Sequence, residues 1–318
     1  MLPVRRLRRF LRSPKGYLLI VLLGLSCVGA AGTGAGAALR GLAAATLSAA
    51  LLELLCVRMR SKAWRMPSSA LLSGLIVAMV LSAQEPFYVP AAAAAVAIGG
   101  KHLLRAGRSH IFNPAAAGLL AVFFLFGSGQ SWWGALANLP AVVIIPVLVG
   151  SAIVANRANK LPAALSFLGV YVSLFTLAAL AGQGTAVADI FRPPFVNIAI
   201  FFGFLMVTDP PTSPVPFKAQ AIFGAGVAAG AFATYLATHG LYFLLAGVLV
   251  ANLGYAATTA VRHRWRNGLA TTRRQFAGSL SGLGVAMRAA VAAHITAALS
   301  PSVDQKLYVD LQARLRGE

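Results

Sequence analysis

Two short polar segments interrupt an otherwise apolar chain, and they carry the residue types best suited to chemistry. The first contains Lys101 and then Ser109, His110, Asn113 and Pro114. Asn followed by Pro is typical of a helix start, because Asn caps free backbone N–H groups and proline has none to satisfy. The remaining N–H groups, beside a lysine and a histidine, suit an anionic or carbonyl group. These residues alone leave two interpretations open, helix capping or a ligand pocket.

The second segment, Thr208 to Pro214, ends an apolar run with an acid. A carboxylate at that depth is costly to desolvate, so we expect Asp209 to face a cavity, a cation or a hydrogen-bonding partner. Pro210 ends the helix before it. A turn held by Asp209 and its neighbouring hydroxyl groups is the structural alternative. Thr208, Asp209 and Ser213 are therefore the second set of candidate binding residues.

Motifs of soluble enzymes are missing from the sequence. It contains no Walker-type glycine loop, no Gly-x-Ser-x-Gly elbow and no His-Glu-x-x-His motif. Cys27 and Cys56 both lie in apolar stretches without Cys-x-x-Cys spacing, so we expect two small buried side chains. We assign no catalytic residue and no metal site to this chain.

The composition indicates a membrane protein. Of 318 residues, 58% are hydrophobic and only 11% charged, too few to cover the surface of a soluble domain. At roughly 20 apolar residues per span, the chain has room for about ten helices. The fourth and eighth segments are short, and we expect half-helices there. The predicted spans cover residues 17–38, 41–57, 68–84, 87–100, 111–127, 133–155, 162–181, 194–208, 219–237 and 239–260.

The net charge of +20 is a topology signal, because the basic residues punctuate apolar runs and do not form a polar face for nucleic acid. All Lys and Arg except Arg40 and Arg192 fall on one side when the loops alternate. We therefore predict a multi-pass protein of the bacterial inner membrane with both termini cytoplasmic. The basic ends are residues 1–16 and 261–318. The tail is interpreted as an amphipathic helix on lipid, a docking segment, or a tail without a specific partner.

Three further side-chain placements follow from this topology. Glu53, near the cytoplasmic end of the second span, is expected to pair with Arg58 or Arg60. Trp132 and Trp133 are expected in the outer aromatic belt of the membrane, where indole rings meet the lipid headgroups.

The two halves of the chain resemble each other, which favours an inverted repeat of residues 17–127 and 128–260. Ser73–Val80 leads to Glu85-Pro86, much as Phe202–Val207 leads to Asp209-Pro210. Five spans separate the two acid-proline pairs, so they would lie on opposite faces of the membrane. Inverted repeats place their binding site where broken helices meet. Chance similarity between apolar segments is the alternative.

Taken together, the motifs resemble those of the RnfD/NqrB family. Its members are integral-membrane components of Rnf-type electron transport complexes and of sodium-translocating NADH:quinone reductase. The likeness covers about residues 65–255 and rests on Lys101, the Ser-His-Ile-Phe-Asn-Pro-Ala run 109–115, the Met-Val-Thr-Asp-Pro-Pro-Thr-Ser run 206–213 and the Ala-Asn-Leu run 251–253.

This resemblance implies an all-α fold of ten helices in two inverted five-helix repeats, similar in shape to urea channels. It implies partners, either other subunits of the complex or a soluble reductase, and a complex that moves Na⁺ or H⁺. It further implies a cytoplasm-facing flavin or quinone pocket around Lys101, His110, Asn113, Pro114, Thr208 and Asp209.

One departure from the family concerns its covalent cofactor. The family esterifies FMN to a threonine between the Asn-Pro-Ala helix and the next span, but here that connection, residues 127–132, contains no threonine. We therefore expect no covalent FMN, and a noncovalent flavin (FMN or riboflavin) or quinone in its place. Two alternatives remain: an inverted-repeat channel without a redox role, and a membrane anchor for a soluble reductase.

Overall fold

The described part of the chain forms helices and one small hairpin. The computed structural model describes residues 8–61, 66–107, 109–137, 142, 144–279 and 285–298. The chain forms two compact units, the first ending at Thr258 and the second beginning at Thr259. The second unit contains the end of α12 (Phe243–Ser279) and α13 (Val285–Ala298), so part of the predicted apolar tail stretch is helical. The first unit contains all other elements described below.

Among the described residues, five helical stretches are long and apolar enough to cross a membrane, which makes the chain an all-α, multi-pass membrane protein. The first two are α2 (Pro14–Thr33) and α3 (Ala35–Ser61). In α3 the apolar stretch runs from Ala35 to Arg60. The third runs from Leu161 to Phe191 through α8 (Leu161–Ala178), η3 (Ala179–Gln183), α9 (Gly184–Val187) and η4 (Ala188–Phe191). The last two are α11 (Phe217–Thr238) and the stretch Phe243–Val261 of α12.

The remaining apolar helices are shorter, and they differ in part from the expected half-helices. The eighth predicted span is short, as expected, because α10 (Pro193–Phe201) continues only into the π-helical turn η5 (Phe202–Met206). The fourth is not the shortest of its half, since α5 (Tyr88–Leu103) has 16 residues. Its neighbours α4 (Ser68–Val80) and α6 (Pro114–Phe126) have 13 each. The sixth predicted span begins late, as α7 (Ile144–Arg157).

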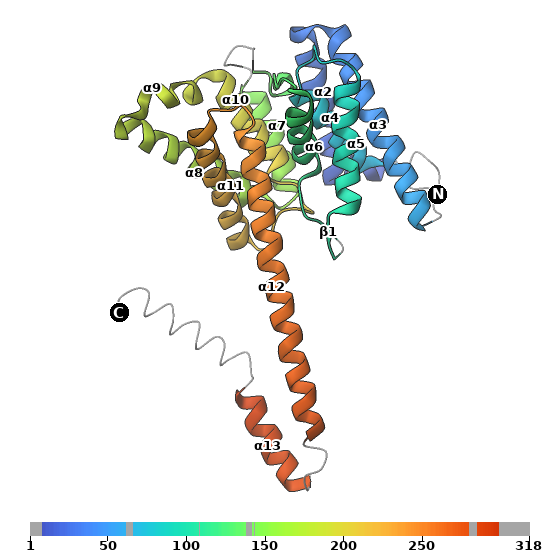
Figure 1. Ribbon diagram of the computed structural model, residues 1–318, viewed down its shortest axis with the longest axis vertical. Coiled ribbons are helices and arrows are strands. Elements are labelled where there is room, and N and C mark those ends of the chain that lie inside the picture. Colours follow the sequence, from blue (N-terminus) through green and yellow to red (C-terminus); the bar gives the residue numbers. More distant parts are fainter. Residues whose placement is uncertain are drawn as a thin grey trace. The chain divides into compact units, whose positions relative to one another are not determined.

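Helix pairs within the first unit pack closely: α3 on α4 and α5, α5 on α6, and α8 on α11 (Figure 1). The opposite face of α3 remains open, because Leu47, Leu51 and Leu55 recur every four residues and are each about 60% exposed. In an apolar solvent such an exposed leucine face costs nothing, so this face of α3 suits contact with lipid.

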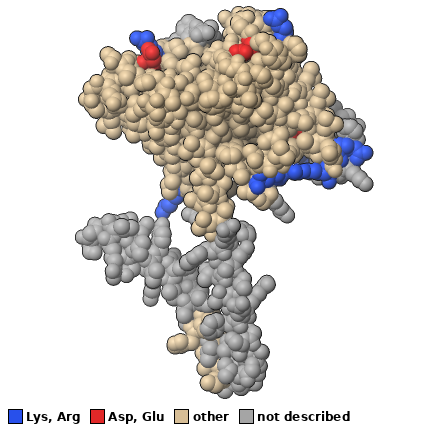
Figure 2. All heavy atoms as spheres, viewed as in Figure 1, with Lys and Arg blue, Asp and Glu red and all other residues tan. Residues whose placement is uncertain are grey.

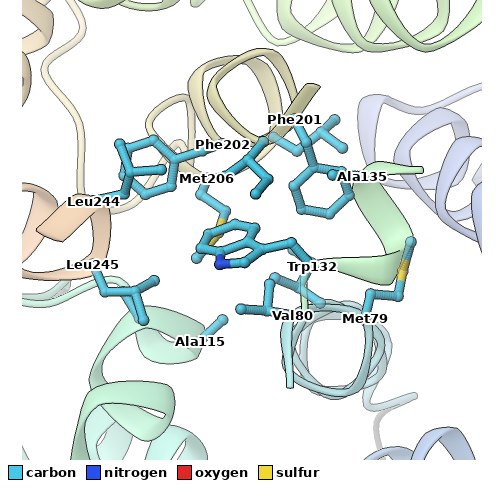
Figure 3. Close-up of a cluster of buried hydrophobic side chains, with 14 of the residues drawn as sticks. Met79, Val80, Ala115, Trp132, Ala135, Phe201, Phe202, Met206, Leu244 and Leu245 are labelled. Atoms are coloured by element: carbon cyan, nitrogen blue, oxygen red, sulfur yellow. The ribbon is translucent and has the colours of Figure 1, made fainter. Parts of the chain in front are cut away.

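The segment after α6 folds back into the centre of the unit. Gln130 pairs with Leu81 in an isolated antiparallel bridge, and the backbone N–H of Trp132 donates to the Val80 carbonyl at 3.1 Å. Trp132 then packs edge-on against Phe201 and Phe202, with ring centroids 6.3 Å apart in each case (Figure 3). The short helix η1 (Trp133–Ala135) follows.

The predicted aromatic-belt position of Trp132 and Trp133 is therefore wrong, since they are only 3% and 2% exposed. The Trp133 indole N–H donates to the Ala78 carbonyl at 2.8 Å, which satisfies the polar atom of this ring inside the protein. The cysteine prediction is also wrong, because Cys27 is exposed and Cys56 half-buried. A thiol is apolar enough to face lipid, so an apolar sequence context did not require burial in the protein.

Glycines allow some of these helices to approach closely. A Cβ atom added to Gly224 of α11 would collide with the backbone carbonyl oxygen of Ala163 in α8. Gly226, two residues away on the same helix, has open space at that position. Small residues at helix contacts are a common device in membranes, where dispersion and backbone proximity hold helices together.

We predict that Gly224→Ala destabilises the protein by about 1–3 kcal/mol, because α8 and α11 must separate to admit the methyl group. Thermal unfolding of the detergent-solubilised protein measures this effect. The matched control is Gly226→Ala, which should be neutral or slightly stabilising, since Ala has less backbone freedom to lose than Gly. Equal melting temperatures for the two variants would contradict the close contact.

Candidate functional site

A cavity of about 570 Å³ opens where both polar segments identified in the sequence meet. Its walls come from α2, α4, α7, the carboxyl end of α5, the start of α6 and the turn after η5. The wall residues divide almost equally between apolar types and types with polar or charged groups. The apolar lining includes Leu18, Leu72, Ile76, Ala115, Val154 and Leu205, and the polar lining includes Lys15, Ser69, Ser73, Lys101, Arg105, Ser109, His110, Asn113, Thr208 and Asp209.

All but one of the predicted binding residues line this cavity: Lys101, His110, Asn113, Pro114, Thr208 and Asp209. Ser213 lies behind the lining, where it is 3% exposed and its hydroxyl donates to the Asp209 carbonyl at 2.7 Å. Ser213 thus supports the turn and does not face the cavity. The signal that suggested it, a hydroxyl near Asp209, is equally typical of a turn.

A two-stranded hairpin carries His110 to the cavity. Arg105–Ala106 (β1) pairs antiparallel with Ser109–His110 (β2), in the register Arg105 to His110. Gly107 makes the tight return possible with a φ of +62°, a backbone conformation that glycine adopts without a steric penalty. The hairpin therefore reverses the chain between the end of α5 and the start of α6.

Asn113 joins the two polar segments. Its side-chain oxygen caps α6 by accepting the Ala116 N–H at 3.1 Å, as predicted, while its Nδ2 donates to the Met206 carbonyl at 2.9 Å. The Asn113 backbone N–H donates to Oδ1 of Asn252 at 2.8 Å, and Asn252 Nδ2 donates to the Thr212 carbonyl at 3.1 Å. We call this Asn113–Asn252 network the asparagine clasp. Both side chains are buried, so the bonds form away from solvent.

Asp209 both stabilises its own turn and faces the cavity, the two alternatives that the sequence left open. Thr212 Oγ1 donates to the Asp209 carboxylate at 2.9 Å, and the Thr212 N–H reaches the Asp209 carbonyl at 3.2 Å. The same carboxylate lines the cavity and lies 3.6 Å from Nε2 of His110. That separation is too long for a hydrogen bond, and buried His110 Nε2 has no hydrogen-bond partner among the described residues.

Lys101 belongs to an ionic cluster that the sequence analysis did not foresee. Its Nζ lies 2.7 Å from Oε1 of Glu53 and 2.7 Å from the Ser69 hydroxyl. The other Glu53 oxygen lies 2.9 Å from Nε2 of His102. Glu53 therefore pairs with α5, whereas the expectation from sequence proximity was a pair with Arg58 or Arg60. The available signal was that Glu53 has no Lys or Arg three or four residues away on its own helix.

A second buried lysine supports the Asp209 turn from outside the cavity. Lys160 is 4% exposed, and its Nζ donates to the carbonyls of Ser213 at 2.9 Å and Pro214 at 2.5 Å. Burial lowers the pKa of the Lys160 amine, and the nearby Asp209 carboxylate partly opposes this by its attraction for the charged form. Sequence reasoning counted Lys160 only as a topology signal.

The cavity suits a planar ligand with a polar edge. A volume of about 570 Å³ falls within the roughly 300–1,000 Å³ typical of small-molecule sites. Aliphatic walls can cover the faces of a conjugated ring, while His110, Asp209 and Lys101 offer hydrogen bonds to its heteroatoms. The described residues contain no group of three or more His, Cys, Asp or Glu side chains that could hold a metal ion.

We predict that Asn252→Ala destabilises the protein by about 1–3 kcal/mol, because it leaves the buried Asn113 N–H and Thr212 carbonyl without their partner. Unfolding in detergent measures the loss. Asn156→Ala is the control, since Asn156 is exposed and its side chain makes no hydrogen bond described here. An Asn252→Ala variant as stable as the control would show that the clasp contributes little.

Comparison with known proteins finds one similarity. No curated protein sequence matches the chain at a significant level. Residues 11–139 match the model of the NQR2, RnfD, RnfE family, a stretch that contains Lys101, His110, Asn113 and Pro114 but not Asp209 or Asn252. This match confirms the resemblance inferred from the motifs for residues 11–139: that part of the chain is similar to the NQR2, RnfD, RnfE family.

Proposed function

We propose that the chain is the membrane subunit of an electron transport complex and holds a noncovalent flavin or quinone in the 570 Å³ cavity. The observation that carries the proposal is the meeting of both motif segments at one cavity, since residues 93 positions apart are joined there by the Asn113–Met206 bond. Similarity to the family through residues 11–139 supports the redox role. Ion translocation would be a property of the assembled complex.

The residues present fit such a ligand. His110 has a buried ring nitrogen without a hydrogen-bond partner in the described part of the chain, and this nitrogen can serve a carbonyl or ring nitrogen of the ligand. Lys101 and Asp209 offer charge at the same cavity, and Leu72, Ile76 and Leu205 offer apolar contact. The bound flavin or quinone would supply the electron transfer, while these residues would bind it, orient it and exclude water.

Matching contacts in the two halves support the proposed ten-helix inverted repeat. Ser48 of α3 donates to the Ala91 carbonyl of α5 at 2.9 Å, and Ser166 of α8 donates to the Ala221 carbonyl of α11 at 2.7 Å. The close glycine contacts are also paired, because Gly118 on α6 meets Ala93 of α5 as Gly247 on α12 meets Ala231 of α11.

The direction of the fifth helix in each half agrees with inversion. In Figure 1, α6 starts on the side of β1, whereas α12 begins on the opposite side and runs toward the β1 side. Two helices with matching partners and opposite directions are what an inverted repeat requires.

The distribution of charge supports a cytoplasmic location for the cavity mouth. Figure 2 shows Lys and Arg side chains along the lower edge of the membrane unit, the side on which Figure 1 places β1. Under the positive-inside rule, this edge faces the cytoplasm of a bacterial inner membrane.

Packing at the centre of the unit disfavours the channel alternative. Trp132, Phe201, Phe202 and Met206 are each at most 3% exposed and meet in one apolar cluster (Figure 3). A conducting path would need space or polar groups at this level. The redox-subunit proposal requires neither, because its ligand enters from the cytoplasmic cavity.

We predict that the purified protein binds riboflavin, FMN or decylubiquinone, and that His110→Ala weakens the binding about tenfold by removing a hydrogen-bonding group worth roughly 1.4 kcal/mol. Equilibrium dialysis with protein in lipid nanodiscs gives the affinities. The control is His239→Ala, because His239 is exposed outside the cavity. Failure of the wild-type protein to bind any of the three ligands would refute the proposal.

We also predict that any flavin carried through purification is noncovalent, since residues 127–132 offer no threonine for a phosphoester. Denaturation should release the flavin into the supernatant, and the intact mass should equal that of the polypeptide. A mass increase of one FMN on the denatured chain would contradict this prediction and show that another residue serves as the attachment site.

A further inference from the structure

The Glu53 cluster has a chain-like arrangement that leads away from the cavity. Lys101 and its partner Ser69 both line the cavity wall. Glu53 lies behind them on α3 and bridges Lys101, at 2.7 Å, to His102, at 2.9 Å. Proton-carrying groups therefore follow one another in the order Lys101, Glu53, His102.

The side chains of these three residues are largely buried, but each keeps a small area accessible to solvent. The side chains of Lys101, Glu53 and His102 are 15%, 11% and 10% exposed. Nδ1 of His102 is buried and has no hydrogen-bond partner among the described residues. With Nε2–H directed at Glu53, Nδ1 would carry the free lone pair of the ring and could accept a proton.

Structural stabilisation alone is a poor explanation of the cluster. Glu53 needs one cation for neutrality, and it has a lysine and a histidine. Buried ion pairs seldom stabilise a fold more than apolar residues of the same size, because desolvation offsets most of their attraction. Ionisable groups inside a membrane protein more often serve transport or proton exchange. The order of groups from the cavity wall to a histidine fits proton exchange.

We propose that Lys101, Glu53 and His102 form a proton relay that supplies the cavity when the ligand bound there is reduced. The inference rests on the proposed function for its electron source, which is a reduced redox partner of the complex. It adds two residues, Glu53 and His102, to the site and gives Lys101 a role beyond binding.

The relay balances as follows. An N–H bond of Lys101 breaks, and the proton goes to a ligand oxygen or nitrogen made basic by reduction. Glu53 accepts a proton from His102 Nε2 at one oxygen, turns its carboxyl group, and gives that proton to Lys101. His102 takes a replacement proton at Nδ1 from water as it gives up the one at Nε2; because Nδ1 is buried in this structure, the ring must turn for water to reach it. Each cycle moves one proton and leaves His102 with its proton on Nδ1, and exchange with water during the same motion returns that proton to Nε2 before the next cycle.

Other charged groups around the relay must be separated from it experimentally. Arg60 donates to the His102 carbonyl at 3.0 Å, which fixes the backbone and leaves the ring free. The His110–Asp209 pair is the other titratable pair on the cavity wall. The remaining charges that line the cavity are those of Lys15 and Arg105.

The first test uses ligand-free protein in nanodiscs and infrared difference spectra between about pH 5 and 9, where histidine titrates. Protonation of His102 should shift the carboxylate band of Glu53. The shift should disappear in Glu53→Gln and in His102→Gln. It should persist in Glu85→Gln, because Glu85 only accepts the Gly129 N–H in a turn outside the cavity. A wild-type spectrum with no Glu53 signal would overturn the relay.

The second test loads the same nanodiscs with decylubiquinone, confirms binding by dialysis, and follows reduction by dithionite in H₂O and D₂O. Glu53→Gln should bind the quinone but slow its reduction by at least about tenfold and lose the solvent isotope effect, as expected when a proton-transfer group is removed. Glu53→Asp should retain both properties, and His102→Gln serves if Glu53→Gln does not fold.

The outcomes separate the two proposals. Wild-type protein that binds none of the ligands refutes the proposed function, and the relay then has no ligand to serve. Protein that binds decylubiquinone, with reduction and isotope effect unchanged in Glu53→Gln, refutes the relay alone and leaves the pocket in place.

Discussion

The fold depends on one requirement, which is that helices ending inside apolar surroundings must have their backbone groups satisfied by other parts of the protein. Water is not available there, and each unpaired N–H or carbonyl would cost several kcal/mol. The asparagine clasp meets this requirement for both polar segments at once. Asn113 bonds to the Met206 carbonyl, and Asn252 of α12 bonds to the backbone of both segments, at Asn113 and at Thr212. The cavity exists because these ends are held open without being left unsatisfied.

The few charged groups inside the unit have well-defined partners. Glu53 lies between Lys101 and His102, and Lys160 lies against two carbonyls of the Asp209 turn. In a protein with only seven Asp and Glu residues, each buried acid has a large influence on its surroundings. Asp209 lines the cavity wall directly, and Glu53 contacts the wall residue Lys101.

The sequence was sufficient to predict the membrane class, most helical segments and six of the 21 residues that line the cavity. Those predictions rest on local signals: apolar length, the Asn-Pro helix start and the acid-Pro helix end. It was insufficient where partners come from distant segments. Glu53 contacts Lys101, which lies 48 positions later in the chain. Trp132 enters the core because residues 129–132 pair with residues 80–82. Neither contact has a signature in the sequence around the residues that make it. The outward position of Cys27 could not be predicted, because lipid and the protein interior are both apolar and composition does not distinguish them.

Proline at position 210 has an effect that extends beyond ending a helix. In a regular helix the carbonyl of Met206 would accept the N–H four residues later, but proline has none to offer. The Asp209 N–H reaches that carbonyl only at 3.4 Å, and the Asn113 amide takes it at 2.9 Å. An acceptor vacated by one imino acid thus becomes the point of attachment for a segment 93 residues earlier in the chain. The lack of an N–H group at Pro210 therefore helps to fix where the first half of the chain docks on the second.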